Sequence, residues 1–152
     1  MSYTMSTVPT WLNSRVTNRQ QSDLLHSLLD TLDSRFASNE PANRSLVSLL
    51  NSLASHLQMH FEWDESDISF AGLEGRAPEL ASEIQQLKVE QNELMHDVGV
   101  LIGLARLAFA ERQGTQSLQD RYQAFQRKFA AHEAAEKNLL QTAFSSHPDL
   151  VD

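Results

Sequence analysis

Apolar side chains recur at alternating spacings of three and four residues through most of this chain. In an α-helix such positions share one face, so each segment with this pattern carries an apolar stripe that must be buried against other helices. The chain is also rich in Leu, Ala, Gln and Glu and has only five glycines and four prolines, a composition typical of helices. The sequence therefore predicts an all-α protein.

Glycine, proline and polar clusters divide the pattern into four long segments. The expected helices span about residues 17–37, 41–67, 78–112 and 117–146. They are separated by the polar stretch SNEPAN, by the loop FAGLEGRAP and by a break at Gly114. Long helices joined by short loops favour an antiparallel up-down-up-down four-helix bundle. We expect this bundle to occupy residues 16–146, with tails at residues 1–15 and 147–152.

Composition narrows the classes of function. There is no cysteine, which excludes disulfides, thiolate metal sites and thiol nucleophiles. The net charge of −8 argues against binding to nucleic acid or to an anionic membrane surface. No apolar run approaches the roughly 20 residues of a membrane-spanning helix. The first residues show no basic stretch followed by an apolar one, so the expected location is the cytoplasm.

Two of the apolar stripes are interrupted by a histidine and a carboxylate four residues apart. These pairs are His60 with Asp64, in the second helix, and His132 with Glu136, in the fourth. Buried carboxylates are costly unless they are paired or coordinated, and the stripes contain no Lys or Arg. Imidazoles and carboxylates that converge inside a helical bundle are typical ligands of non-haem iron or zinc. His56, one turn before His60, is either a further ligand or a neighbour of the site, and a metal-free polar core is the alternative.

The residues around both pairs resemble the haemerythrin-like (HHE cation-binding) family. His60-Phe61-x-x-Asp64-Glu65 resembles the family's HFxxEE motif, and HEAAEKNLLQTAF, which begins at His132, is similar to its fourth-helix HxxxE segment. LKVEQNELMHDV resembles the third-helix pattern L..EH..L...V, and the matching blocks cover about residues 20–144. The resemblance implies a four-helix bundle that holds a dinuclear non-haem iron centre and binds dioxygen, or senses oxygen or iron.

The chain departs from the family pattern at several ligand positions. The third-helix Glu-His pair is replaced by Glu90-Gln91, and the first-helix ligand position falls on Ser22. His26, one turn after Ser22, is a candidate substitute ligand. Asp64 is one methylene shorter than the family's glutamate and would bridge two metal ions less easily. The intact set is His60, Asp64, His132 and Glu136, which is enough for one metal ion, with His56 and His26 as further candidates.

The leading hypothesis is therefore a haemerythrin-like protein that binds one or two iron ions, with zinc as the alternative metal. Such a protein would interact with dioxygen or sense iron rather than act as an enzyme. A metal-free four-helix interaction module is the second hypothesis. Glu93 and His96 lie off the apolar stripe and are expected on a solvated face. A histidine phosphotransfer role would need an exposed His96 with a cation beside it, and the sequence has no Lys or Arg after His96 until Arg106.

Overall fold

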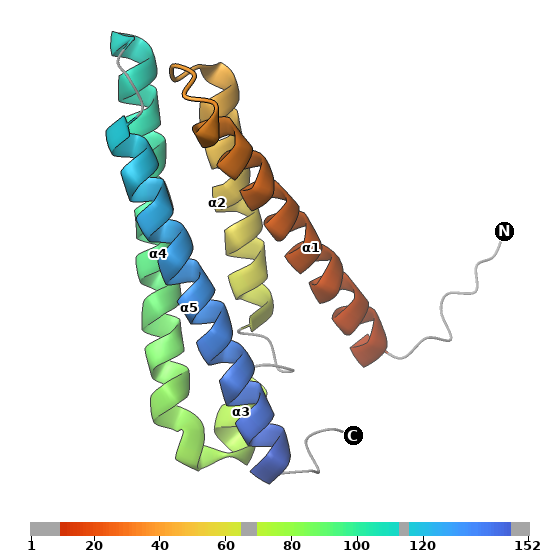
Figure 1. The fold of residues 1–152 in the computed structure, drawn as a ribbon. Helices are drawn as coiled ribbons and strands as arrows, with labels where there is room; N and C mark the ends of the chain where they lie inside the picture. The colour runs from red at the N-terminus through yellow and green to blue at the C-terminus, as the bar shows by residue number, and fades with distance from the viewer. Residues whose placement is uncertain (1–9, 65–69, 113–115, 147–152) are drawn as a thin grey trace, which may run out of the picture.

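The computed structural model describes the backbone of residues 10–64, 70–112 and 116–146, and the side chains of residues 20–62, 73–112 and 116–146. Its elements are α1 (Thr10–Ala37), α2 (Arg44–Asp64), α3 (Phe70–Arg76), the 3-10 turn η1 (Pro78–Leu80), α4 (Ala81–Glu111) and α5 (Gln116–Ser146). Figure 1 shows these elements in space. The described residues contain no β-strand, and the all-α prediction is confirmed.

The four long helices lie alongside one another. α1 packs on α2, α2 on α4, and α4 on α5. The connection from α1 to α2 lies at the same end of the molecule as the end of α4 and the start of α5 (Figure 1). The short helix α3 lies at the opposite end, beside the start of α4 and the end of α5 (Figure 1).

Local backbone chemistry sets the boundary between α1 and α2. Asn39 has a φ of 56°, a left-handed conformation that asparagine tolerates better than most residues and that ends a helix. The side-chain oxygen of Asn43 then accepts a hydrogen bond from the backbone N–H of Leu46 at 2.9 Å, which caps the first turn of α2. The polar stretch between the two long leucine-rich segments therefore forms a tight connection, as predicted.

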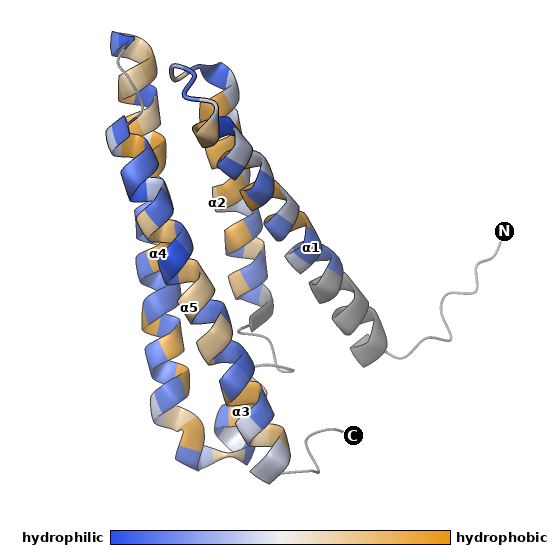
Figure 2. Cartoon of the chain, in the orientation of Figure 1, coloured by the Kyte–Doolittle hydropathy of each residue, from blue (hydrophilic) through white to orange (hydrophobic). Residues whose placement is uncertain are grey.

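The buried apolar side chains form two clusters along the length of the molecule. The larger cluster joins α1, α2, α4 and α5, and includes Leu25, Leu57, Leu94 and Phe129. The smaller cluster joins α3, η1, α4 and α5. Its buried members are Leu73, Ala77, Leu80, Ile84, Leu87, Leu139 and Ala143. Figure 2 shows hydrophobic and hydrophilic residues alternating along each long helix, as the spacing of three and four requires.

Tyr122 of α5 connects that helix to α1. Its hydroxyl lies 3.0 Å from the carbonyl oxygen of Leu29 and 2.9 Å from a carboxylate oxygen of Asp33. Its ring stacks on Phe36 with the centroids 4.7 Å apart. Burial is the main cause that raises the pKa of Tyr122, and Asp33 adds to it. The hydroxyl therefore stays protonated and acts as a hydrogen-bond donor between the two helices.

Several boundaries differ from the sequence-based prediction. α2 begins at Arg44 rather than near Pro41, and the start of the third expected helix is the 3-10 turn η1, so α4 begins at Ala81. The segment FAGLEGR, predicted as a loop, forms α3, because Leu73 is buried in the smaller cluster and Glu74 pairs with Lys88 of α4 at 3.0 Å. These contacts outweigh the weak helix propensity of the glycines. The first helix begins at Thr10, earlier than the Thr17 expected.

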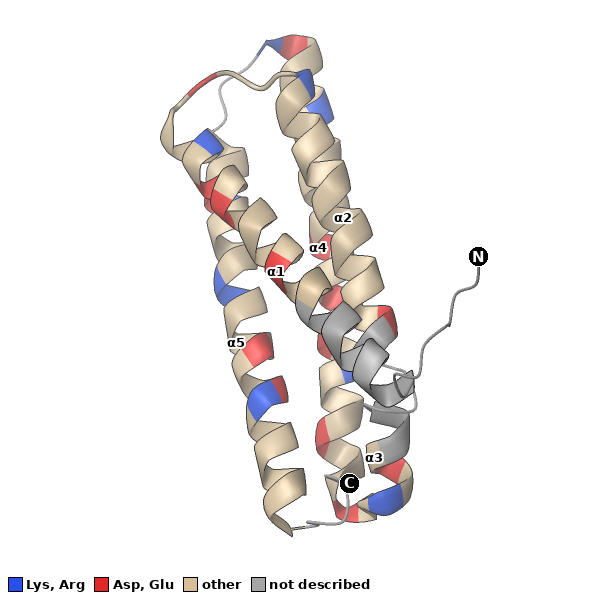
Figure 3. Ribbon diagram, turned by 90° about the vertical axis from the view of Figure 1, so that its right-hand side faces the viewer, with Lys and Arg blue, Asp and Glu red and all other residues tan. Residues whose placement is uncertain are grey.

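The charged residues are of both signs along the long helices. Figure 3 shows acidic and basic residues close together on α5, and the sequence of this helix includes Glu133, Glu136 and Lys137. None of the described helices is long and apolar enough to cross a bilayer.

Candidate metal centre

Three buried polar side chains lie where the two apolar clusters meet, and we call them the polar layer: His60 of α2, Gln91 of α4 and His132 of α5. They are 7%, 3% and 2% exposed, respectively. On α4, Gln91 separates Leu87 of the smaller cluster from Leu94 of the larger one. The predicted inward direction of His60, Gln91 and His132 is confirmed.

His132 is held by carboxylates on both sides of its ring. Nδ1 lies 2.8 Å from Glu90 Oε1, and because a carboxylate only accepts, Nδ1 carries the proton of this hydrogen bond. Nε2 lies 3.5 Å from Glu136 Oε2, one turn further along α5. Burial alone would lower the pKa of His132, but Glu136 and Glu90 outweigh it and the pKa is raised.

The atoms of the second contact are buried and have no hydrogen bond. Neither His132 Nε2 nor Glu136 Oε2 finds a hydrogen-bond partner among the described residues, and their separation of 3.5 Å is longer than a normal N–H···O bond. Buried polar atoms without partners are uncommon and require an explanation. The hydrogen bond from Nδ1 to Glu90 leaves the Nε2 lone pair of a neutral His132 directed toward this contact.

His60 is the second imidazole of the centre and its environment favours the neutral ring. Burial is the main cause that lowers the pKa of His60, against the opposing effect of Glu136 and Glu133, and charge on His132 lowers it further. The ring of Phe61 contacts both imidazoles, with centroids 5.8 Å from His60 and 5.6 Å from His132. Phe61 therefore links the imidazole of α2 to that of α5, and the convergence of the two histidines on one site stays a prediction.

The remaining candidate ligands take different positions. His26 is half-exposed, and its Nε2 lies 2.8 Å from Glu133 Oε2 on α5, so in this arrangement it forms a surface pair between α1 and α5. His56 is partly buried, and its Nδ1 has no hydrogen-bond partner among the described residues. Ser22 is also partly buried. Asp64 is the last residue of α2 and its side chain lies outside the described part of the chain.

Two carboxylates make contacts that the sequence pattern did not predict. Glu90, which the pattern identifies only as part of a motif, bonds His132, and Glu133 bonds His26. Each of these glutamates is adjacent in sequence to a residue of the polar layer. A long side chain at the edge of the apolar stripe can reach a partner on another helix, which the spacing of residues along one helix does not identify. The available signal was the adjacency of Glu90 to Gln91 and of Glu133 to His132.

Glu93 and His96 are exposed, as predicted. The structure adds cations that the sequence did not place there, because Arg121 and Lys128 of α5 line the same cavity as His96. However, the ammonium of Lys128 lies 3.1 Å from both Glu93 and Asp97. These two carboxylates neutralise Lys128 and would repel a phosphoryl group on His96, so the arrangement does not favour phosphotransfer.

Within the described side chains, no three His, Asp or Glu residues lie close enough together to hold a metal ion. The contact between His132 and Glu136 supplies two donor atoms. Both of these residues also influence the pKa of His60, which Glu136 raises and His132 lowers. The fold and this centre together define an all-helical protein with two buried imidazoles in its polar layer and carboxylates beside one of them.

The family comparison agrees with this class. The family described as Hemerythrin HHE cation binding domain matches residues 15–144. The chain therefore belongs to the haemerythrin family of cation-binding domains. No curated protein and no solved structure matches the chain.

Proposed function

We propose that this protein binds one metal ion at a site founded on His132 Nε2 and Glu136 Oε2. The single observation that supports this proposal is a pair of buried donor atoms that lie 3.5 Å apart on one helix, as a long ion pair without a hydrogen bond. Metal–nitrogen and metal–oxygen bonds of ~2.1 Å at tetrahedral angles place two ligand atoms about 3.4 Å apart. The separation in the structure therefore suits two ligands of one ion better than it suits a direct hydrogen bond.

The partners of these two residues also suit a metal ligand. A histidine that binds a metal through one ring nitrogen usually donates its other N–H to a carboxylate, which fixes the tautomer and the direction of the ring. Glu90 accepts such a bond from His132 at 2.8 Å. We propose that His60 and Asp64 of α2 complete the ligand set, and that binding draws α2 and α5 together.

The residues present do not fit a dinuclear centre. Gln91 and Ser22 stand where the family has imidazoles, and neutral amide and hydroxyl groups are poor ligands for iron among nitrogen and carboxylate donors. His26 is held by Glu133 in a surface pair. We therefore propose one ion rather than two, and we place Gln91 and Ser22 as hydrogen-bond partners of the centre that do not bind the metal.

Iron is the metal that we propose, with zinc as the alternative, because both accept imidazole and carboxylate ligands. A bound iron ion would supply redox chemistry and an affinity for dioxygen. The protein's own contribution is a buried, low-dielectric pocket in which Glu90 orients His132 and Phe61 packs against both imidazoles. We infer a role in sensing iron or dioxygen in the cytoplasm rather than in enzymatic turnover.

The topology that we propose for residues 16–146 is an antiparallel up-down-up-down bundle of α1, α2, α4 and α5. The positions of the helix ends in Figure 1 support it, and the structure extends the first helix of this unit to Thr10, inside the stretch predicted as an N-terminal tail.

A metal-free interaction module is the second candidate. One observation favours it: both ring nitrogens of His132 already lie next to a carboxylate, Glu90 at 2.8 Å and Glu136 at 3.5 Å. In that case His132 and its two carboxylates form a polar core that serves the packing of α4 and α5.

A metal titration separates the two candidates. Protein without a His-tag, stripped with chelator, is titrated anaerobically with Fe²⁺ and separately with Zn²⁺ in a calorimeter. One site per chain that disappears in His132→Ala supports the metal-binding proposal, and His96→Ala is the matched control on an exposed histidine. Equal weak binding by the wild type and His132→Ala would favour the interaction module.

A further inference from the structure

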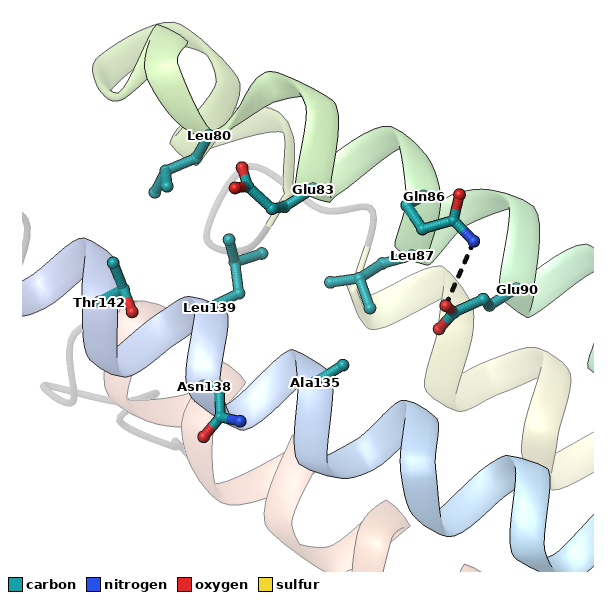
Figure 4. A pocket seen from close by; sticks show the side chains of 9 residues that line it. All are labelled: Leu80, Glu83, Gln86, Leu87, Glu90, Ala135, Asn138, Leu139 and Thr142. Atoms are coloured by element: carbon teal, nitrogen blue, oxygen red, sulfur yellow. Dashed lines mark hydrogen bonds between the residues drawn. The ribbon is translucent and has the colours of Figure 1, made fainter.

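A cavity of about 360 Å³ lies between α4 and α5, at the end of the molecule where α3 packs. Leu80 of η1 and Leu87 of α4 face Leu139 of α5 across it, and Figure 4 shows these side chains in the space between the helices. All three leucines belong to the smaller apolar cluster. Leucines of the smaller apolar cluster therefore form the apolar wall of the cavity.

Polar side chains line both edges of this cavity. Glu83 and Glu90 stand on the α4 edge, and Asn138 and Thr142 stand on the α5 edge (Figure 4). Both ionisable side chains that line the cavity are carboxylates, and its lining includes no Lys or Arg. An apolar wall with negative charge on one edge complements a ligand that has an apolar body and a positive head group.

The two carboxylates are not equivalent. Glu90 is already engaged, because its Oε1 bonds His132 at 2.8 Å and its Oε2 accepts a hydrogen bond from Gln86 at 3.3 Å. Glu83 is exposed at the other end of the α4 edge. A cationic head group would therefore pair with Glu83, while the apolar body covers the leucines and extends toward Glu90.

We propose that this cavity binds a small organic cation, an amine with a compact aliphatic or aromatic body. The volume lies at the lower end of the range of small-molecule sites, roughly 300–1,000 Å³. The site is built by η1, α4 and α5 and needs no metal, so this inference does not rest on the proposed metal centre. Its link to that centre is Glu90, which lines the cavity and bonds His132.

The test compares three ligands with matched bodies and different charges: 4-phenylbutylammonium, 4-phenylbutanol and 4-phenylbutyrate. Each is titrated into ¹⁵N-labelled, metal-free full-length protein, and backbone amide shifts are followed by NMR. We expect saturable shifts at residues that line the cavity, and an affinity for the ammonium about tenfold higher than for the carboxylate, because like charges oppose the anion. Shifts scattered over the whole chain, or equal affinities for all three ligands, would overturn the proposal.

Substitutions locate the charge and the body of the ligand. Glu83→Gln is expected to weaken ammonium binding about two- to fivefold, the size of a solvent-exposed ion pair, and to leave 4-phenylbutanol binding unchanged. Glu111→Gln, an exposed carboxylate at the far end of α4, is the matched control and should have no effect. Ala135→Phe would fill the cavity and abolish binding of the ammonium and the alcohol alike, in a variant whose NMR spectrum shows an intact fold. If Glu83→Gln behaves as Glu111→Gln does, the cavity does not select cations and the proposal is wrong.

Discussion

The hydrogen bond between Glu90 and His132 allows the sharpest test of how the centre is built. Its length is 2.8 Å, the imidazole is 1% exposed and the carboxylate 29% exposed. Hydrogen bonds to charged groups contribute about 1.5–3 kcal/mol and neutral ones about 0.5–1.5 kcal/mol. Glu90→Gln keeps an oxygen that can accept from Nδ1 but removes the charge, so we expect a loss of roughly 1 kcal/mol of unfolding free energy in metal-free protein.

The pH dependence of this loss follows from the direction of the pKa shift. Because the pKa of His132 is raised above the ordinary 6.5, the folded state binds the proton more tightly than the unfolded state, and the resulting stabilisation is present below about pH 6.5. It disappears as the pH rises through the raised pKa. The effect of Glu90→Gln should therefore be largest at about pH 5.5 and smallest at about pH 9.

Urea denaturation in the presence of EDTA measures this difference, and Glu93→Gln is the matched control. Glu93 lies three residues after Glu90 on α4 but pairs with Lys128 at the surface. Its substitution should cost under about 1 kcal/mol and leave the pH profile unchanged over this range. In metal-loaded protein, Glu90→Gln should also weaken metal binding about tenfold, because it alters the partner that orients a ligand. A pH-independent loss, or one equal to that of Glu93→Gln, would refute this reasoning.

Three further outcomes are expected. Fe²⁺ or Zn²⁺ at about 100 times its Kd should stabilise the wild type by about 2.7 kcal/mol at neutral pH and raise Tm by roughly 5–10 °C. Calorimetry should show that this increment is lost in His132→Ala. The increment should also be smaller near pH 5, because protons compete with the metal for the imidazoles. Because burial lowers the pKa of His60, the unfolded state binds the proton of this residue more tightly than the folded state does. His60 should therefore make metal-free protein less stable as the pH falls below about 6.5. His60→Gln should reduce that acid sensitivity in urea titrations, and an unchanged profile would show that the ring is charged in the folded state. Tyr122→Phe should lower the free energy of unfolding by about 1–3 kcal/mol, because it removes the hydroxyl that donates to Leu29 and Asp33. Hydrogen exchange should show faster opening of α1. Faster exchange spread evenly over all helices would argue against a specific connection between Tyr122 and α1.

The spacing of apolar residues predicted the buried face of each long helix because helical periodicity determines which positions share a side. Gln91 and the two histidines of the polar layer were placed inward on this basis, and all three are buried. The same periodicity contains no information on how far a side chain reaches. For this reason it did not predict that Glu90 contacts His132 or that His26 pairs with Glu133 across two helices.

Helix α3 shows a second limit of sequence patterns. A segment of seven residues with two glycines has little intrinsic helix propensity, and its structure depends on the burial of Leu73 against α4 and α5. That burial exists only after the long helices have packed. The residues that line the cavity are likewise far apart in the sequence. Only the packing of α4 against α5 brings Glu83 and Leu139 to one site.

Anomalous diffraction at the iron and zinc absorption edges, from crystals of untagged protein grown with each metal, tests the central claim most directly. The proposal of a single ion predicts one anomalous peak per chain, within about 2.0–2.2 Å of His132 Nε2 and Glu136 Oε2, and no peak in His132→Ala crystals grown in the same way. Two peaks about 3.5–4 Å apart would show a dinuclear centre. A polar layer with no peak at either edge would show that the centre does not bind these metals, and would contradict the account.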